Sequence, residues 1–187
     1  VDALIEAPVR DAVSQLIDAV EPAPERLETQ EGNAYLLQPA WDTRDRLFLF
    51  GAGHVGRAIA TALSPLDFRI VWADERDEEY PAELPENAEK WLRDDLVGLV
   101  GSEMRRGDFA LVMTHDHQLD FEICEALLRC DDLSYVGLIG SDTKRTRFER
   151  RWRTRGVEEA AVDRLVCPIG VAGITGKKPA EIAASVA

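Results

Sequence analysis

The sequence predicts an α/β fold with a doubly wound, mostly parallel sheet and helices on both faces. Three observations lead to this prediction. The apolar segment 47–50 is followed at once by glycines at 51, 53 and 56, in G-x-G-x-x-G spacing. Apolar residues then recur at helical intervals, and Asp74 closes a second apolar segment about 20 residues further on. The glycine spacing alone is weak evidence, but with a strand before it and a helix after it the stretch predicts a Rossmann-like unit.

Each glycine of this stretch has its own expected task in a phosphate-binding turn. Gly51 allows the tight turn, Gly53 lets a phosphate approach the backbone, and Gly56 lets the helix pack closely on the strand. The helix that begins at His54 offers free N–H groups to an anion. Asp74 stands where such units place the acid that binds a ribose. In the alternative interpretation, the glycines serve turn geometry alone and Asp74 is a solvated charge.

The rest of the chain alternates between strand and helix patterns, which supports the parallel sheet. Polar residues and two prolines predict a loop over 75–89. Predicted strands cover 46–50, 69–74, 88–92, 110–114 and 134–139, with a further apolar segment at 166–170. Predicted helices cover 54–64, 94–100, 118–130 and 143–155, and a last one begins at Pro179.

Residues 1–43 form a leader that differs in character from residues 44–187, the expected Rossmann-like domain. Apolar residues between Val9 and Val20 recur with helical spacing, residues 21–32 are polar and predict a linker, and residues 34–38 predict an edge strand. So short a segment cannot bury a core of its own. We expect it to be the remnant of an N-terminal domain or to pack on the main one.

Composition narrows the class of protein. A net charge of −13 argues against a general nucleic-acid-binding surface, because phosphates must be neutralised by an excess of Lys and Arg. No apolar run approaches the ~20 residues that span a bilayer, so we expect no membrane segment. Three cysteines without a CxxC pair indicate neither a disulfide framework nor a zinc site, and they favour a cytoplasmic location.

A second polar cluster, Thr114 to Asp120, follows a predicted buried strand. His115 and His117 are two residues apart, so an extended backbone would point both to one side. Together with Asp120 they could form a metal site or an acid–base cluster, although contact with a ligand is the preferred interpretation. In the alternative, purely structural interpretation, Asp116 and Gln118 begin a helix and the histidines bind loop carbonyls.

Two further segments carry candidate residues. Ser141 and Lys144 begin the helix after the next strand, where they could bind a phosphate or carboxylate, with Lys144 as a mobile positive charge. The arginines that follow along the same helix predict a solvated face, or a surface that pairs with acidic residues or a partner. Near the end of the chain Cys167 precedes a glycine-rich loop, and a buried, inert thiol is its expected state.

Five motifs together resemble the C-terminal domain of the XdhC family, the xanthine dehydrogenase accessory proteins. They are GAGHVGRAIA, the D-x-R of Asp74 and Arg76, THDHQLD, GLIGSDTKR and CPIGVAGITGKKPAEIA, and they follow one another in the family's order. The resemblance covers about residue 46 to the end of the chain. From this resemblance we expect the family's usual N-terminal domain to be missing here, apart from residues 32–39, which look like its last strand.

The resemblance implies a maturation factor that binds the molybdenum cofactor, a molybdopterin, and protects it. Its implied partners are a xanthine dehydrogenase-type molybdenum enzyme and the cysteine desulfurase that sulfurates the cofactor. The resemblance leaves undecided whether the chain forms a homodimer. A chaperone that binds the cofactor is preferred to an enzyme that turns over a substrate. The rivals are an NAD(P)-binding oxidoreductase and a dinucleotide-sensing module. The motif positions transfer as ligand contacts only: Gly51, Gly53, His54, Gly56, Asp74, Arg76, Thr114, His115, His117, Ser141 and Lys144.

Overall fold

The computed structural model describes all of the chain except residues 1–7, 10, 14–24, 30–31, 38–43 and 175. The chain divides into two compact units, Val1–Thr43 and Arg44–Ala187.

The first unit contains a small antiparallel pair of strands, β1 (Glu25–Glu28) and β2 (Ala34–Leu37). The strand expected at 34–38 is therefore present. The linker expected over 21–32 is wrong in part, because residues 25–28 pair with β2 through backbone groups that a polar sequence does not reveal. Of the predicted leader helix, residues 8–9 and 11–13 are helical, and most of the remainder lies outside the described residues.

The second unit is built on a six-stranded parallel sheet with the order β5-β4-β3-β6-β7-β8. When β3 is counted as the first strand of this unit, the order becomes 3-2-1-4-5-6, which is the doubly wound order. The predicted fold class is therefore confirmed. The strands are β3 (Asp45–Phe50), β4 (Phe68–Asp74), β5 (Ala88–Leu92), β6 (Phe109–Val112), β7 (Tyr135–Leu138) and β8 (Leu165–Val166).

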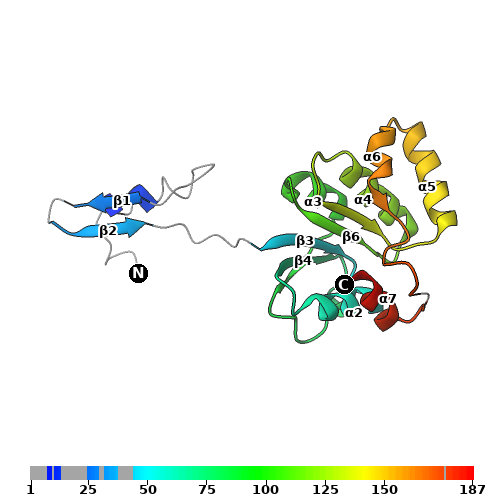
Figure 1. Ribbon diagram of the computed structural model, residues 1–187, viewed down its shortest axis with the longest axis horizontal. Coiled ribbons are helices and arrows are strands. Elements are labelled where there is room, and N and C mark those ends of the chain that lie inside the picture. The colour runs from blue at the N-terminus through cyan, green and yellow to red at the C-terminus, as the bar shows by residue number, and fades with distance from the viewer. Residues whose placement is uncertain (1–7, 10, 14–24, 30–31, 38–43, 175) are drawn as a thin grey trace. The chain divides into compact units, whose positions relative to one another are not determined.

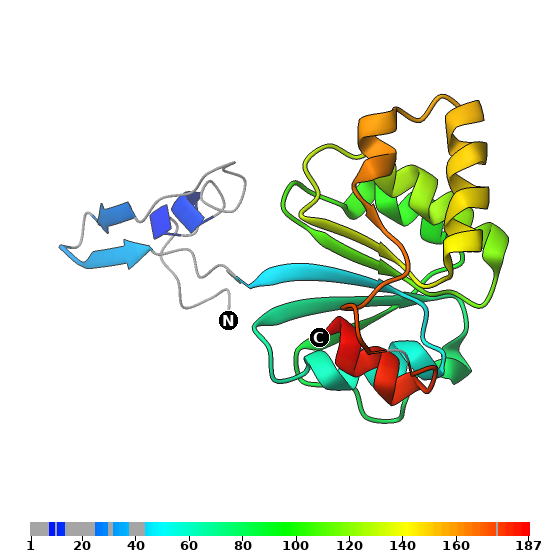
Figure 2. The same ribbon diagram turned by 45° about the vertical axis from the view of Figure 1, so that its right-hand side comes forward.

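Helices cover both faces of this sheet (Figures 1 and 2). They are α2 (His54–Leu63), α3 (Leu96–Glu103), α4 (His117–Leu128), α5 (Asp142–Thr154), α6 (Glu159–Asp163) and α7 (Pro179–Val186), with a 3-10 turn, η1 (Asp77–Glu79). The sequence patterns missed α6 and η1, which are only five and three residues long. Within the described residues, no helix combines the length and the apolar character that crossing a bilayer requires.

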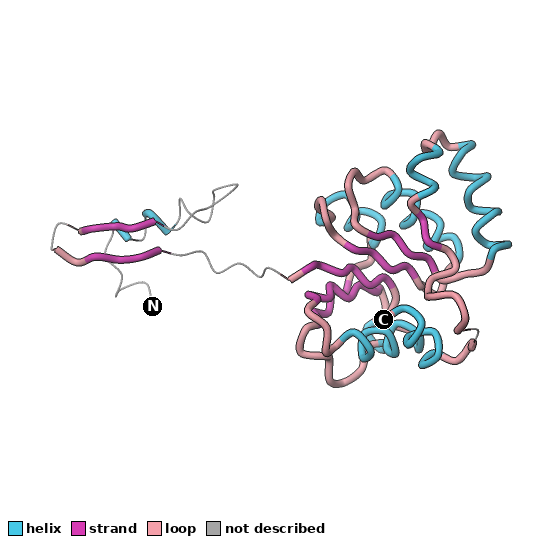
Figure 3. Tube along the Cα trace, in the orientation of Figure 1, coloured by secondary structure: helices cyan, strands magenta, loops and turns pink. Residues whose placement is uncertain are grey.

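Alternation along the strands creates two cores, one on each side of the sheet. In β3, Phe48 and Phe50 join one core, whereas Leu47 and Leu49 join the other, as the two-residue period of a strand requires. The first core includes residues of α3, α4, α5 and α6, and the second includes residues of α2 and α7. The strands therefore lie between two helical layers, as Figure 3 shows for the second unit. Because both faces of β3 are covered from Leu47 onward, residues 47–50 are continuously apolar.

Candidate functional site

The carboxyl ends of the parallel strands bring the predicted site residues to one edge of the sheet. The glycine turn follows β3, Asp74 ends β4, Thr114 follows β6 and Ser141 follows β7. Strand order reverses between β3 and β6, because β4 and β5 lie on one side of that pair and β7 and β8 on the other. Open α/β sheets bind their ligands at this switch point.

Two of the three glycines are required by the fold itself. Gly51 has a φ of +117°, and a Cβ there would overlap the carbonyl group of Met113, beyond the end of β6. A Cβ on Gly56 would overlap the carbonyl oxygen of Gly51 and lie 3.7 Å from Nε1 of Trp72. That indole nitrogen itself donates to the Gly51 oxygen at 3.0 Å. Gly56 thus lets α2 pack against the turn as well as against β4.

Gly53 is different, because neither its backbone nor its neighbours require a glycine. Its φ is −64°, and no atom lies within 4 Å of the position that a Cβ would take. It occupies the N-cap position of α2, where it supplies no side-chain hydrogen bond. By contrast, α3, α4 and α5 are capped by side chains of this chain: Asp95, Asp116 and Ser141. Within the described residues no side chain caps the N-terminus of α2, and the space beside Gly53 is open, which is an arrangement that suits an anion.

Asp74 connects the end of β4 to the glycine turn. The residue is buried, at 2% exposure. Oδ2 accepts the N–H of Ala52 at 2.6 Å and a guanidinium N–H of Arg76 at 3.0 Å. Oδ1 accepts the backbone N–H of Arg76 at 2.9 Å and its Nε at 3.0 Å. Four donors match the roughly four lone-pair positions of a carboxylate, so Asp74 is saturated by the protein. Burial acts to raise the pKa of Asp74, but the hydrogen bonds from Arg76 and Ala52 outweigh it and hold this pKa below its ordinary value.

The other side of the switch point contains a buried ion pair that joins α4 to α5. Asp120 is 1% exposed, and its Oδ2 accepts Nζ of Lys144 at 2.6 Å. Its Oδ1 accepts the backbone N–H and the hydroxyl of Thr114, at 2.9 and 2.8 Å. Nζ of Lys144 also donates to the carbonyl of Ile139 at 2.8 Å. The expectation of a mobile charge on Lys144 is therefore wrong: its ammonium group is held between β7 and α4.

The sequence analysis did not identify the role of Asp120. The sequence placed it in a cluster with His115 and His117, whereas the structure turns it inward. The available signal was its position four residues after the N-cap Asp116 and four before the buried Cys124, which puts it on the inner face of α4.

The two histidines are exposed on the loop and on the first turn of α4. Nε2 of His115 lies 3.6 Å from a carboxylate oxygen of Glu75, which follows β4, so these two loops meet across the switch point. Asp116 caps α4 by accepting the N–H of Gln118 at 2.6 Å, as the purely structural interpretation of this segment predicted. In the part of the chain that the structure describes, no group of three or more His, Cys, Asp or Glu side chains could hold a metal ion.

Beyond β7 the same edge contains a cavity of about 320 Å³. Its lining mixes apolar side chains with polar groups and comprises Ile139, Gly140, Pro168, Ile169, Ile174, Gly176, Lys177, Ile182 and Ser185. Two strand spacings of about 4.8 Å separate β3 from β7, so a ligand of moderate size bound at the glycine turn could extend toward this cavity.

Cys167 lies buried beside the cavity, at 3% exposure. Burial raises the pKa of its thiol to about 11, against smaller opposing effects of Lys144 and Arg145. The thiol is therefore protonated at neutral pH, as expected for an inert buried cysteine.

Comparisons with known proteins agree with the resemblance that the five motifs suggested. The family model described as the XdhC Rossmann domain matches residues 47–187. The uncharacterized protein YqeB of Escherichia coli K12 is 35% identical over 145 residues, which are 76% of this chain and 26% of that protein.

Among solved structures, the crystal structure of a xanthine dehydrogenase from Bacillus halodurans aligns with a TM-score of 0.64 and 28% identity. The alignment covers 82% of this chain and 42% of that one. The chain thus spans less than half the length of each of these two relatives.

Proposed function

Since this chain belongs to the XdhC Rossmann domain family, we propose that it is the ligand-binding part of an accessory protein serving a xanthine dehydrogenase-type molybdenum enzyme. Its proposed ligand is the molybdenum cofactor, bound at the carboxyl edge of the sheet and protected there until handover. A cysteine desulfurase that sulfurates the cofactor is the second proposed partner.

The observation that carries the proposal is the open start of α2 at Gly53. Nothing in the described fold requires a glycine at this N-cap position, and a side chain there would occupy space that is open beside the start of α2. A phosphate group of the pterin fits this place, because the N–H groups and the helix dipole both favour an anion. The cavity beyond β7 is the candidate place for the ring system, since its lining combines apolar side chains such as Ile139 and Ile182 with the polar groups of Lys177 and Ser185.

The state of Asp74 favours this ligand over NAD. In a dinucleotide site the acid after the second strand accepts hydrogen bonds from ribose hydroxyls. Here Ala52 and Arg76 already supply four donors to that carboxylate, so a ribose would have to displace one of them. For the same reason we propose a cofactor carrier and not a dehydrogenase, with a dinucleotide-sensing module as the remaining alternative.

A binding experiment with a matched pair of variants tests the proposal. Gly53→Val fills the proposed phosphate position, whereas Gly101→Val places the same side chain in equally open space on α3, away from the switch point. We expect molybdopterin to bind wild type and Gly101→Val with equal affinity and Gly53→Val at least tenfold more weakly. Isothermal titration at equal folded fraction measures this difference.

The same titration is repeated with NADH and NADPH, which we expect to bind more weakly than molybdopterin. Unchanged molybdopterin affinity in folded Gly53→Val would show that the phosphate is bound elsewhere. Tighter binding of NADH, or its steady oxidation with a panel of small carbonyl compounds, would favour the oxidoreductase.

A further inference from the structure

Helix α5 is strongly basic on a chain whose net charge is −13. Its thirteen residues, DTKRTRFERRWRT, contain six Lys or Arg and two Asp or Glu. Neighbouring positive charges three and four residues apart on a helix repel one another, so such a cluster is destabilising unless other groups compensate it. The partner of each positive charge therefore indicates whether that charge stabilises the fold or is available to bind another molecule.

About half of the positive charges on α5 are neutralised within the protein. Lys144 is buried against Asp120. Arg145 pairs with Glu149 at 2.7 Å, and Arg153 pairs with Glu159 at 2.6 Å. The side chain just after the helix, Arg155, pairs with Glu125 of α4 at 2.6 Å. These contacts fix α5 to its neighbours and need no outside partner.

Three arginines differ from this group. Within the described part of the chain, Arg147 and Arg150 have no carboxylate partner. Arg151 donates to the amide oxygen of Gln118 at 3.0 Å, and its guanidinium lies 3.8 Å from the centre of the Phe121 ring. Neither contact neutralises its charge. The ring contact does hold the guanidinium in place, which lowers the entropy lost when an anion binds.

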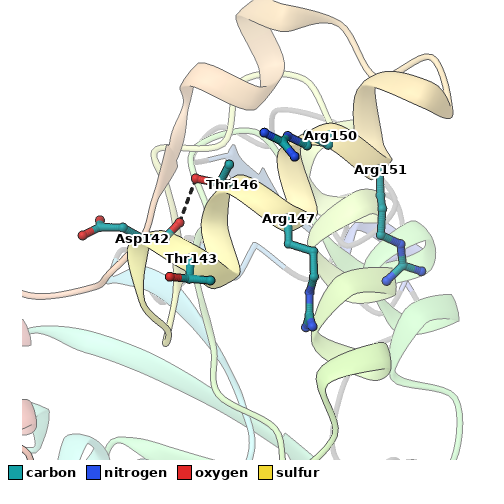
Figure 4. A pocket seen from close by; sticks show the side chains of 6 residues that line it. All are labelled: Asp142, Thr143, Thr146, Arg147, Arg150 and Arg151. Carbon is teal, nitrogen blue, oxygen red and sulfur yellow. Dashed lines mark hydrogen bonds between the residues drawn. The ribbon is translucent and has the colours of Figure 1, made fainter.

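These arginines line a shallow groove along α5, made of two cavities of about 610 and 270 Å³ that share Arg150 and Arg151. Figure 4 shows the larger one, in which the side chains of Arg147, Arg150 and Arg151 project from the helix. Thr143 and Thr146 also line the larger cavity and Thr154 the smaller. The hydroxyls of Thr146 and Thr154 donate to backbone carbonyls of α5, so the arginines are the main donors that the groove offers to a ligand. Asp142 lies at the N-terminal end of the groove.

We propose that this groove, lined by Arg147, Arg150, Arg151 and the three threonines, binds an extended acidic segment of a partner protein. Arg147 and Arg151 are four residues apart, a rise of about 6 Å. Alternate side chains of an extended peptide are about 6.7 Å apart, so two carboxylates at positions i and i+2 match this spacing. The whole helix is about 20 Å long, which suits a segment of about six residues.

A short segment fits better than a nucleic acid. A long polyanion would extend from the groove onto the acidic remainder of a chain with 35 Asp and Glu against 22 Lys and Arg. The proposal does not depend on the ligand at the glycine turn.

The test measures fluorescence anisotropy of labelled eight-residue peptides with the full chain. One peptide has glutamate at alternate positions and the other has glutamine there. The groove variant is Arg147→Gln/Arg150→Gln/Arg151→Gln. The control variant, Arg26→Gln/Arg69→Gln/Arg106→Gln, removes the same charge from arginines outside α5 that are paired with Glu28, Glu89 and Asp132.

We expect the glutamate peptide to bind wild type and the control within threefold of one another, and the groove variant at least tenfold more weakly. The double variant Arg147→Gln/Arg150→Gln retains the contact between Arg151 and Phe121, so it keeps the test valid if the triple variant is unstable. We expect this double variant to bind the glutamate peptide at least threefold more weakly than wild type does.

Three outcomes would overturn the proposal. Equal losses in the groove and control variants would mean that only net charge matters. Tighter binding of a twelve-nucleotide single strand than of the glutamate peptide would indicate a polyphosphate site. Self-association of wild type that the groove variant abolishes, together with binding of a peptide of residues 75–89, would assign the groove to a second copy of this chain.

Discussion

Removing the ammonium group of Lys144 should destabilise the second unit far more than removing an exposed lysine. Asp120 is 1% exposed and the Lys144 side chain 10%, so Lys144→Met leaves a carboxylate buried without its cation. Breaking a buried pair from one side costs about 3–5 kcal/mol. The two donors from Thr114 remain, which places the expected cost near the lower end, at about 3 kcal/mol.

Lys90→Met is the matched control, because Lys90 pairs with Asp77, whose side chain is 69% exposed. An exposed pair contributes about 0–1 kcal/mol. Urea unfolding followed by circular dichroism, with a shared slope, should therefore separate the two variants clearly.

A double-mutant cycle provides the sharper measurement. Asn in place of Asp120 keeps an oxygen for the Thr114 N–H but has no charge that needs Lys144. Lys144→Met/Asp120→Asn should therefore be more stable than Lys144→Met, and the coupling free energy should be about 2 kcal/mol. A cost below about 1 kcal/mol for Lys144→Met, or additive effects in the cycle, would refute the role we assign to this pair.

Two further predictions concern ionisation. The pKa of Asp74 is lowered in the folded state, so its contribution to stability is present above the unfolded value of about 3.9 and is lost as pH falls through the folded value. Asp74→Asn should cost about 2–3 kcal/mol at pH 7, and its difference from wild type in urea unfolding should shrink below about pH 4; a constant difference would contradict the assignment. The pKa of Cys167 is raised to about 11, so iodoacetamide should leave this thiol unmodified at pH 7.5 in the folded chain and modify it in urea, as peptide mass spectrometry can measure. Rapid alkylation of folded Cys167 would show that the thiol is accessible and ionised.

The local elements of the second unit could be predicted because their signals are local. The strand before Gly51, the turn and α2 depend on neighbouring residues: apolar side chains that form a strand, and glycines where a Cβ would collide with backbone. The predicted strand 88–92 has the same bounds as β5, and the other strands of the sheet agree within a few residues. The edge of the sheet at which the motifs gather also follows from the alternation of strand and helix, because parallel strands end on the same side.

Only the tertiary structure decided how the charged side chains pair. Lys144 pairs with Asp120, which is 24 residues away in sequence, and Asp74 accepts the N–H of Ala52, which is 22 residues away. Such pairs depend on which strands are adjacent and in which register, and a single sequence carries no local signal for either. The same holds for Arg147 and Arg150, which look like the other arginines of their helix in sequence. What distinguishes them is the absence of a carboxylate within reach in the described structure, and that depends on where α4 and α6 place their acidic residues.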